Sequence, residues 1–146
     1  MTYQVCVDGV VRDATPEEIA EDIERSILSV EAMRVAKNVE IDGWRAQANS
    51  STFAFGGKLI ACDALSRSDI DGVANHIALF GTFPEDFPGG WKVTDKTMLP
   101  LPDIDSFRAM YGAMTKQGAK NFNRSQELKA QLAAATTPEE IAAIMW

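Results

Sequence analysis

The chain has 146 residues, of which 46% are hydrophobic and 24% charged, and its formal net charge is −7. This length and balance are typical of one folded domain and exclude a largely disordered chain. No apolar run reaches the roughly 18 residues that cross a bilayer, and an acidic chain disfavours phosphate binding, so we expect neither a membrane nor a nucleic acid as partner.

The N-terminal residues and the two cysteines bear on the compartment of the protein. Residues 1–15 lack the basic start and apolar core of a signal peptide, so we expect the chain to stay in the cytoplasm that makes it unless a larger assembly carries it out. Cys6 and Cys62 lie in apolar, strand-like surroundings and match no zinc-binding spacing. We therefore expect buried, reduced thiols, with a disulfide as the alternative.

The charge is distributed unevenly along the chain. Residues 1–24 carry seven acidic side chains against Arg12 alone, whereas residues 107–132 carry five basic side chains against Glu127. The asymmetry allows two interpretations. Either both segments are solvated helix faces, or the acidic segment meets the basic helix, within the chain or in a neighbouring copy.

The first third of the chain predicts a hairpin followed by a long helix. Residues 3–11 form two short strands around an Asp8-Gly9 turn. Thr15, Pro16 and Glu18 then supply an N-cap, a first helical residue and the second half of a capping box. The apolar residues that follow keep helical spacing: Ile19, Ile23, Ile27, Val30 and Met33.

The sequence leaves the end of this helix open. Ile41, Trp44 and Ala48 continue the apolar stripe, which extends the helix to about residue 48. Asp42-Gly43 is the competing signal, because glycine disfavours a helix interior and would end the helix there.

Two further hairpins are predicted on either side of a second helix. Gly56-Gly57 suits the two-residue turn of a hairpin over residues 52–62, which places Phe53 opposite Ile60. Residues 91–94 and 97–99 predict the other hairpin around Asp95-Lys96, and Pro100 and Pro102 stop it.

The second helix lies between these hairpins, and its apolar face points to the core. Ser66 and Asp69 predict its cap after Asp63 ends the preceding strand. Its face carries Ile70, Val73, Ile77 and Phe80. We expect one core with these members: Phe53, Phe55, Ile60, Ile70, Val73, Ile77 and Trp91.

The C-terminal third predicts a long helical region. Its apolar residues fall on one face, with a phase slip near Gly118: Ile104, Phe107, Tyr111 and Met114, then Phe122, Leu128 and Leu132. Thr137-Pro138-Glu139-Glu140 predicts a last helix that ends at Trp146. The hexapeptide TPEEIA occurs at 15–20 and at 137–142, which we interpret as one favourable helix start used twice; a duplicated docking helix is the alternative.

These elements predict an α+β fold in which two short β-hairpins pack on helices, with a long N-terminal helix and a long C-terminal helical region. We divide the chain into an N-terminal hairpin with an acidic amphipathic helix (residues 1–36) and an α+β domain with C-terminal helices (residues 37–146).

The common catalytic and metal-binding motifs are missing from the sequence. His76 is the single histidine, so a histidine-based metal cluster is impossible, and a structural or surface role is the expected one. Asp63, Asp69 and Asp71 cluster near a helix start, where carboxylates cap the helix. The sequence has neither a nucleophile elbow nor a phosphate-binding loop. We therefore expect no enzyme activity, no catalytic residue, no cofactor and no metal.

A series of short motifs runs through residues 37–146. It begins with Trp44-Arg45, the hairpin from Phe53 to Lys58, and Asp63 followed by the helix start Ser66–Ile70. It continues with a tryptophan-led hairpin from Trp91 to Leu101, a long helix, and the alanine-rich segment Leu128–Thr136. This series resembles a domain of unknown function near the C-terminus of many small proteins encoded among phage tail-fibre and tail-assembly genes. The related hairpins usually read Asp-Asn where this chain has Asp95-Lys96.

The resemblance implies a non-enzymatic, tail-associated structural or adaptor protein of the virion, made in the host cytoplasm. An assembly chaperone that leaves before the particle is complete is the first alternative, and an acidic inhibitor of a host protein is the second. The implied partners are other phage tail proteins or further copies of the chain. We expect the interface on the helical segments 16–37 and 103–146, with these candidate residues: Ile19, Ile23, Ile27, Phe107, Tyr111, Met114 and Trp146.

Overall fold

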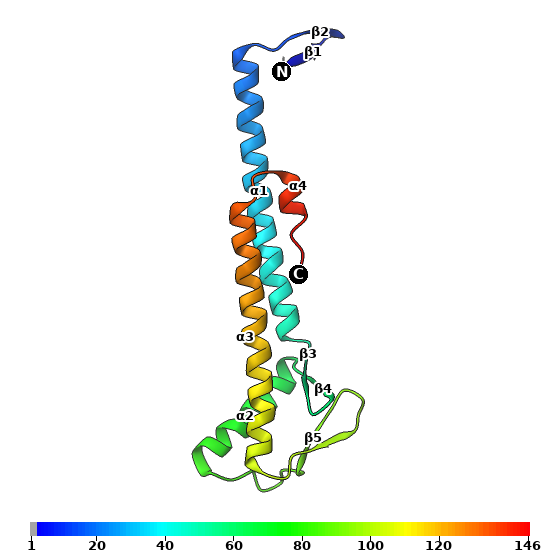
Figure 1. Cartoon of the computed structure of the whole chain (residues 1–146), viewed down its shortest axis with the longest axis vertical. Coiled ribbons are helices and arrows are strands. Elements are labelled where there is room, and N and C mark those ends of the chain that lie inside the picture. Colours follow the sequence, from blue (N-terminus) through cyan, green and yellow to red (C-terminus); the bar gives the residue numbers. More distant parts are fainter. Residues whose placement is uncertain (1–2) are drawn as a thin grey trace. The chain divides into compact units, whose positions relative to one another are not determined.

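The computed structural model describes residues 3–146 and confirms the α+β fold (Figure 1). Within these residues the structure has three separate two-stranded antiparallel hairpins. The predicted fold named two hairpins packed on helices, and the N-terminal hairpin is the third. The elements in chain order are β1 Gln4–Val7, β2 Val10–Asp13, α1 Pro16–Asn49, β3 Thr52–Phe55, β4 Lys58–Ala61, α2 Ala64–Phe80, β5 Gly90–Lys92, β6 Met98–Pro100, α3 Ile104–Ala134 and α4 Pro138–Ala142.

The chain forms two compact units, and the two long helices α1 and α3 each contribute to both. One unit contains the described residues as far as Glu40 together with Lys129–Met145. The other contains Ile41–Leu128 and Trp146. The first unit therefore joins the N-terminal helix to the end of α3 and to α4, which are far away in sequence.

The N-terminal hairpin and the start of α1 follow the predicted local chemistry. Val7 pairs with Val10, so Asp8 and Gly9 form a two-residue turn with φ of 52° and 82°. Such turns require positive φ at both positions, which Asp-Gly tolerates. At the helix start the Glu18 amide donates to the Thr15 hydroxyl (3.3 Å) and the Thr15 amide donates to the Glu18 carboxylate (2.9 Å). This is the predicted capping box.

α1 continues through Gly43 to Asn49, which settles the question of its length. A glycine inside a helix costs only about 1 kcal/mol relative to alanine. Ile41 is fully buried beside it, and burying one such side chain contributes about 1.5–3 kcal/mol. Packing therefore outweighs the local preference of Asp42-Gly43.

The middle of the chain confirms the second hairpin and corrects the cap of α2. Phe53 faces Ile60 across β3 and β4, and both are buried. The cap of α2 is Asp63, whose carboxylate accepts the amides of Leu65 (3.1 Å) and Ser66 (3.0 Å). The predicted cap at Ser66 and Asp69 was wrong, because Asp63 already satisfies these first amides and the helix starts at Ala64.

The third hairpin is present, but its first strand covers Gly90–Lys92 where 91–94 was predicted, and its second strand lies one residue later than predicted, at Met98–Pro100. Lys92 pairs with Met98, and the turn runs through Asp95 and Lys96. Lys96 has φ of 67°, a left-handed conformation that asparagine adopts more readily than lysine. Pro100 does not stop the strand but forms its last residue, opposite Gly90.

α3 is one continuous helix, and α4 is shorter than predicted. The capping box of Thr137 and Glu140 starts α4 as expected. The helix ends at Ala142, not at Trp146, and Ile144 is buried in the segment that follows. The two TPEEIA segments thus both start helices by the same capping contacts, which favours the interpretation that one helix start is used twice.

The predicted core is confirmed within the second unit. Phe53, Ile60, Ile70 and Ile77 are buried in one cluster, while Phe55, Val73 and Trp91 pack against it. Phe107 lies at its aromatic centre and is only 1% exposed. Its ring meets three others edge-on, at centroid distances of 6.1 Å (Phe83), 6.3 Å (Phe87) and 6.2 Å (Trp91).

Removing the Phe107 ring should destabilise the fold strongly. We expect Phe107→Ala to lower the free energy of unfolding by about 3–5 kcal/mol. The neighbouring rings are held on the loop 81–89 and on β5, so they cannot move in to fill the cavity. Urea denaturation measures this loss. Leu79→Ala, at an exposed position of α2, is the matched control and should change stability by about 0.5 kcal/mol or less. A loss below about 1 kcal/mol for Phe107→Ala would place the core elsewhere.

Candidate interaction surface

Most residues in the first half of α1 are exposed, although its first turns lie beside the N-terminal hairpin. Residues 20–29 are all exposed, and Val30 is the first of the following residues to be half-buried. Ile27 is 63% exposed and Ile23 is 48% exposed, while Ile19 is half-buried near the N-terminal hairpin. The apolar stripe predicted for this helix is therefore present, and its members between Ala20 and Ser29 are exposed in the described chain.

The β1–β2 hairpin in front of α1 exposes apolar side chains as well. Val7, Val10 and Val11 all lie on its surface, and Tyr3 precedes it. We call residues 3–29, the hairpin and the first half of α1, the arm. Figure 1 shows the arm in dark to light blue, with α1 continuing beyond α4 in the same unit. Exposed apolar side chains thus lie on both the hairpin and the helix of the arm, and exposed apolar surface is often a binding site for another protein.

The arm is also strongly acidic. It contains seven acidic side chains and two arginines, a net charge of −5. Arg12 forms two hydrogen bonds with the Glu18 carboxylate, at 2.7 and 2.8 Å, and Arg25 lies 3.8 Å from Asp22. The two arginines are thus paired locally and leave a surface that is apolar and negative.

A second apolar stripe lies on α1 and was missed by the sequence analysis. Leu28, Ala32, Val35 and Val39 recur at helical spacing and are all exposed, Val39 by 66%. They lie about 180° around the helix from Lys37 and Ile41, which face the packed side. The signal was readable as a second set of i, i+4, i+7 positions, but the longer isoleucine stripe took precedence.

The structure corrects the candidate residues on α3. Phe107 and Met114 are buried in the core of their own chain, so neither belongs to an exposed stripe. Tyr111 is half-buried against the same core; burial raises the pKa of its phenol, and a hydrogen bond with Asp71 adds to that effect. Trp146 is 39% exposed and remains available. The apolar face of α3 is buried inside its own chain, where it belongs to one cluster with residues of β3, β4 and α2.

Two basic side chains hold the part of α1 that follows the arm. The Arg34 guanidinium donates to the Ala135 carbonyl just after the end of α3. The Lys37 ammonium donates to the Ile144 carbonyl (3.4 Å) and pairs with Glu40 (2.6 Å). Basic groups stabilise the unpaired carbonyls at a helix end. These contacts begin about one turn after the arm ends, so they separate a packed part of α1 from an unpacked part.

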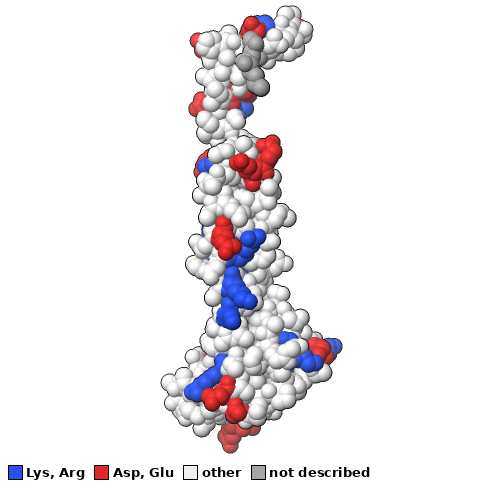
Figure 2. All heavy atoms as spheres, viewed as in Figure 1, with Lys and Arg blue, Asp and Glu red and all other residues white. Residues whose placement is uncertain are grey.

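The exposed side of α3 is basic. Figure 2 shows lysine and arginine side chains gathered over the middle of this helix. Lys116 and Lys120 are exposed, one turn apart. Arg108 pairs with Asp105 (3.1 Å) and Arg124 with Glu127 (3.5 Å). These two pairs are formed within α3, so the two arginines have local partners on their own helix.

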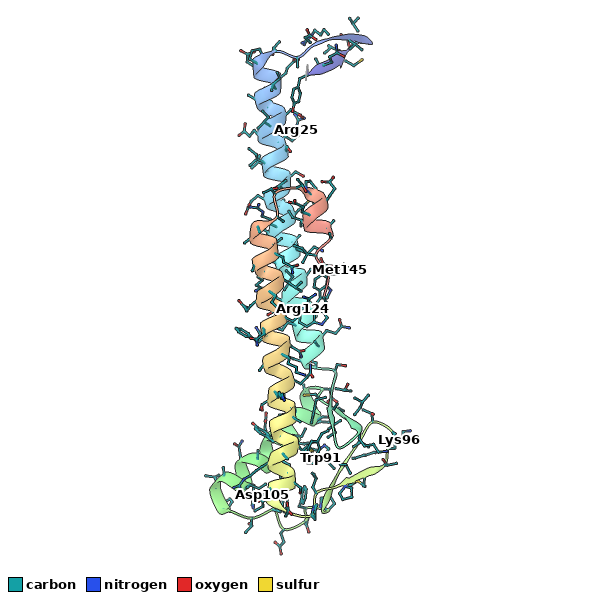
Figure 3. The ribbon with its side chains drawn as sticks, in the orientation of Figure 1. Arg25, Trp91, Lys96, Asp105, Arg124 and Met145 are labelled. Atoms are coloured by element: carbon teal, nitrogen blue, oxygen red, sulfur yellow. The ribbon has the colours of Figure 1, made fainter. Side chains whose placement is uncertain are left out.

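The second unit contains an open groove of about 860 Å³ that the sequence did not predict. Val73 of α2, Phe87 and Pro88 of the connecting loop, and Trp91 and Met98 of the third hairpin line it. Figure 3 shows Trp91 and Lys96 in this region of the chain. Walls that are mainly apolar suit a hydrophobic side chain of a partner or a small apolar molecule. The groove depends on the fold of the loop 81–89, which periodicity does not predict.

The remaining sequence-based expectations concern thiols, metals and membranes. Cys62 is buried as predicted, and burial raises the pKa of its thiol. Cys6 is exposed, so the prediction of a buried thiol is wrong there. The reason is that no other element of the described chain packs over the β1–β2 hairpin at this position. Both cysteines are free. Among residues 3–146, no three histidine, cysteine or carboxylate side chains lie together as metal ligands would, and no helix has both the length and the apolar content to cross a membrane.

Comparison with known families identifies the domain. Residues 32–145 match the family described as Domain of unknown function (DUF4376), and the chain belongs to that family. The match begins three residues after the arm ends, so the arm lies outside the family domain. No curated protein and no solved structure matches the chain. The family description names no function, and the association with phage tails is therefore taken up below as a proposal.

The start of the arm helix should respond to acid. Three hydrogen bonds from Arg12 and Thr15 lower the Glu18 pKa from 4.5 to about 2. A carboxylate with a lowered pKa stabilises the fold above its unfolded pKa, and this contribution is lost as the pH falls through the folded pKa. We expect the first turn of α1 to fray between pH 4.5 and about 2.

Carbon NMR of the side-chain carboxyls measures this titration, and the amide shifts of residues 17–20 report the fraying. Glu18→Gln removes the charge and should fray the first turn already at neutral pH. Glu21→Gln, which changes an exposed carboxylate one turn later, should leave the first turn intact. A Glu18 midpoint close to 4.5 would show that the ion pair with Arg12 is not formed in solution.

Proposed function

We propose that the chain is a non-enzymatic structural or adaptor subunit of a bacteriophage tail, located at the tail, the baseplate or the site of tail-fibre attachment. Its partners are other tail proteins and further copies of the chain, and its interface is the arm with the adjoining exposed face of α1. No nucleic acid, membrane, metal or cofactor takes part in this function.

The unpacked first half of α1 is the observation that carries the proposal. Isolated helices of fewer than about 12–15 residues are marginally stable in water, and most helical stability in proteins comes from packing an apolar face. Residues 20–29 are all exposed in their own chain, and they include the large apolar residues Ile23, Ile27 and Leu28. A helix of this kind becomes stable when another protein covers it, which supports an assembly function.

The motifs of the domain supply the phage-tail context. The resemblance to tail-fibre and tail-assembly proteins rests on short motifs spread over residues 37–146, and the match to DUF4376 covers nearly the same range. The capping Asp63, the core position of Trp91 and the turn at Lys96 give these motifs structural roles. The motifs therefore support the same domain scaffold, to which the arm adds the proposed means of attachment.

An exposed acidic and apolar arm also suits an assembly chaperone, which would cover a tail protein and then leave. The two functions differ in one observable, the presence of the chain in finished particles. An inhibitor of a host protein would be absent from particles and would bind no tail protein.

Quantitative mass spectrometry of gradient-purified particles, from the phage whose genome encodes the chain, tests the proposal. We expect the chain at a constant ratio to the major tail proteins through successive purification steps. A chain that co-purifies with tail proteins from the lysate but is absent from particles would identify a chaperone. A chain that is absent from particles and binds no tail protein in the lysate would overturn the proposal and favour a host target.

A further inference from the structure

We propose that the arm of one copy docks on the exposed face of α3 in a second copy, with Lys116 and Lys120 facing its acidic side chains. This inference rests on the proposed function and names a partner for its interface. We call the receiving surface the lysine face; it consists of exposed residues at helical spacing: Ala109, Gly112, Lys116, Ala119, Lys120 and Asn123.

Charge favours the lysine face over a second arm as the partner. Two arms laid against each other would bring a net charge of −5 against another of −5. Like charges in direct contact destabilise an interface by several kcal/mol. The lysine face carries no acidic residue, whereas the arm carries a large excess of them, so contact between the two surfaces joins opposite charges.

The two lysines are available for such a contact. Among the described residues, neither Lys116 nor Lys120 forms an ion pair, in contrast to Arg108 and Arg124 on the same helix. On the arm, Glu21 and Glu24 are likewise exposed and form no ion pair with the described residues. Two lysines and two glutamates with no partner in their own copy thus form a complementary set.

The surfaces also match in length and in apolar content. At 1.5 Å per residue, the helical part of the arm (Pro16–Ser29) and the lysine face (109–123) each measure about 21 Å. Phe122, at the border of the lysine face, is 45% exposed and its ring is stacked under the Arg45 guanidinium at 4.8 Å. Ile23 and Ile27 can cover this ring and the alanine and glycine positions beside it. Apolar contact then supplies affinity, while the charges set register and direction.

The arm and the lysine face are different surfaces, so the proposed contact is heterologous. Each copy that offers its arm to one neighbour still has a free lysine face for the next. Such contacts propagate into a ring when the rotation closes and into a filament when it does not. Either outcome suits a component that repeats around or along a tail.

Charge reversal on each side, followed by mixing, tests the inference. One variant carries Lys116→Glu with Lys120→Glu, and the other carries Glu21→Lys with Glu24→Lys. All four positions are exposed, so circular dichroism should show unchanged folding of the family domain. Multi-angle light scattering at micromolar concentration should show that the unaltered chain associates and that about 1 M salt, where the Debye length is about 3 Å, weakens the association.

We expect each variant alone to associate about tenfold or more weakly than the unaltered chain, and an equimolar mixture of the two to recover association. Recovery follows because the reversed arm of one variant then faces the reversed α3 of the other. Lys92→Glu with Lys96→Glu, the same charge change placed on the third hairpin, is the control and should leave association unchanged.

Three results would overturn the inference. The first is a chain that stays monomeric at every concentration tested. The second is unaltered association of the α3 variant while Ile23→Ser with Ile27→Ser abolishes it, which would show that arms pair with arms. The third is a mixture that fails to recover. A monomeric chain that is nevertheless found in particles would refute only this inference and leave the tail function standing.

Discussion

A long helix is stable only where one of its faces is covered, and α1 meets this condition along its second part alone. From Val30 onward the helix is packed, and Arg34 and Lys37 donate to backbone carbonyls after α3 and after α4. Before Val30, ten successive residues are all exposed. The capping box of Thr15 and Glu18 starts the helix but contributes only about 1 kcal/mol, too little to hold an uncovered helix by itself. The acidic and apolar arm, the boundary of the family domain and the proposed assembly function all follow from this difference.

The family domain is, by contrast, packed within its own chain. Its aromatic centre at Phe107 joins α3 to the loop before β5 and to Trp91. A salt bridge of 2.7 Å between Lys58 and Asp95 and a hydrogen bond of 2.9 Å from the Thr94 amide to the Leu59 carbonyl connect the second and third hairpins. Because these contacts are all internal to the second unit, this unit can serve as a scaffold held together by its own residues. The arm can then vary its partner without altering that scaffold.

Turns, strand pairs and helix caps were predictable from the sequence. Which helix faces are buried by other elements was not. The Asp8-Gly9 turn, the Phe53–Ile60 pair and both capping boxes depend on neighbouring residues, so the residue types determine them. Ile23 and Ile27 are four residues apart, as are Met110 and Met114, yet the first pair is exposed and the second is buried. Periodicity shows that a helix has an apolar face, but only the fold shows what lies against it. The groove beside Trp91 was missed for a similar reason, because it depends on the fold of the loop 81–89.

The central claim is that the first half of α1 depends on contacts from outside its own chain. Amide hydrogen exchange of the unaltered protein, measured at protein concentrations below and above its association midpoint, tests this most directly, because exchange reports local opening. We predict that residues 20–29 exchange rapidly in dilute solution and become protected as the concentration rises, while residues 107–128 of α3 remain protected throughout. Strong protection of residues 20–29 in the dilute monomer would contradict the account, because the helix would then be stable without a partner.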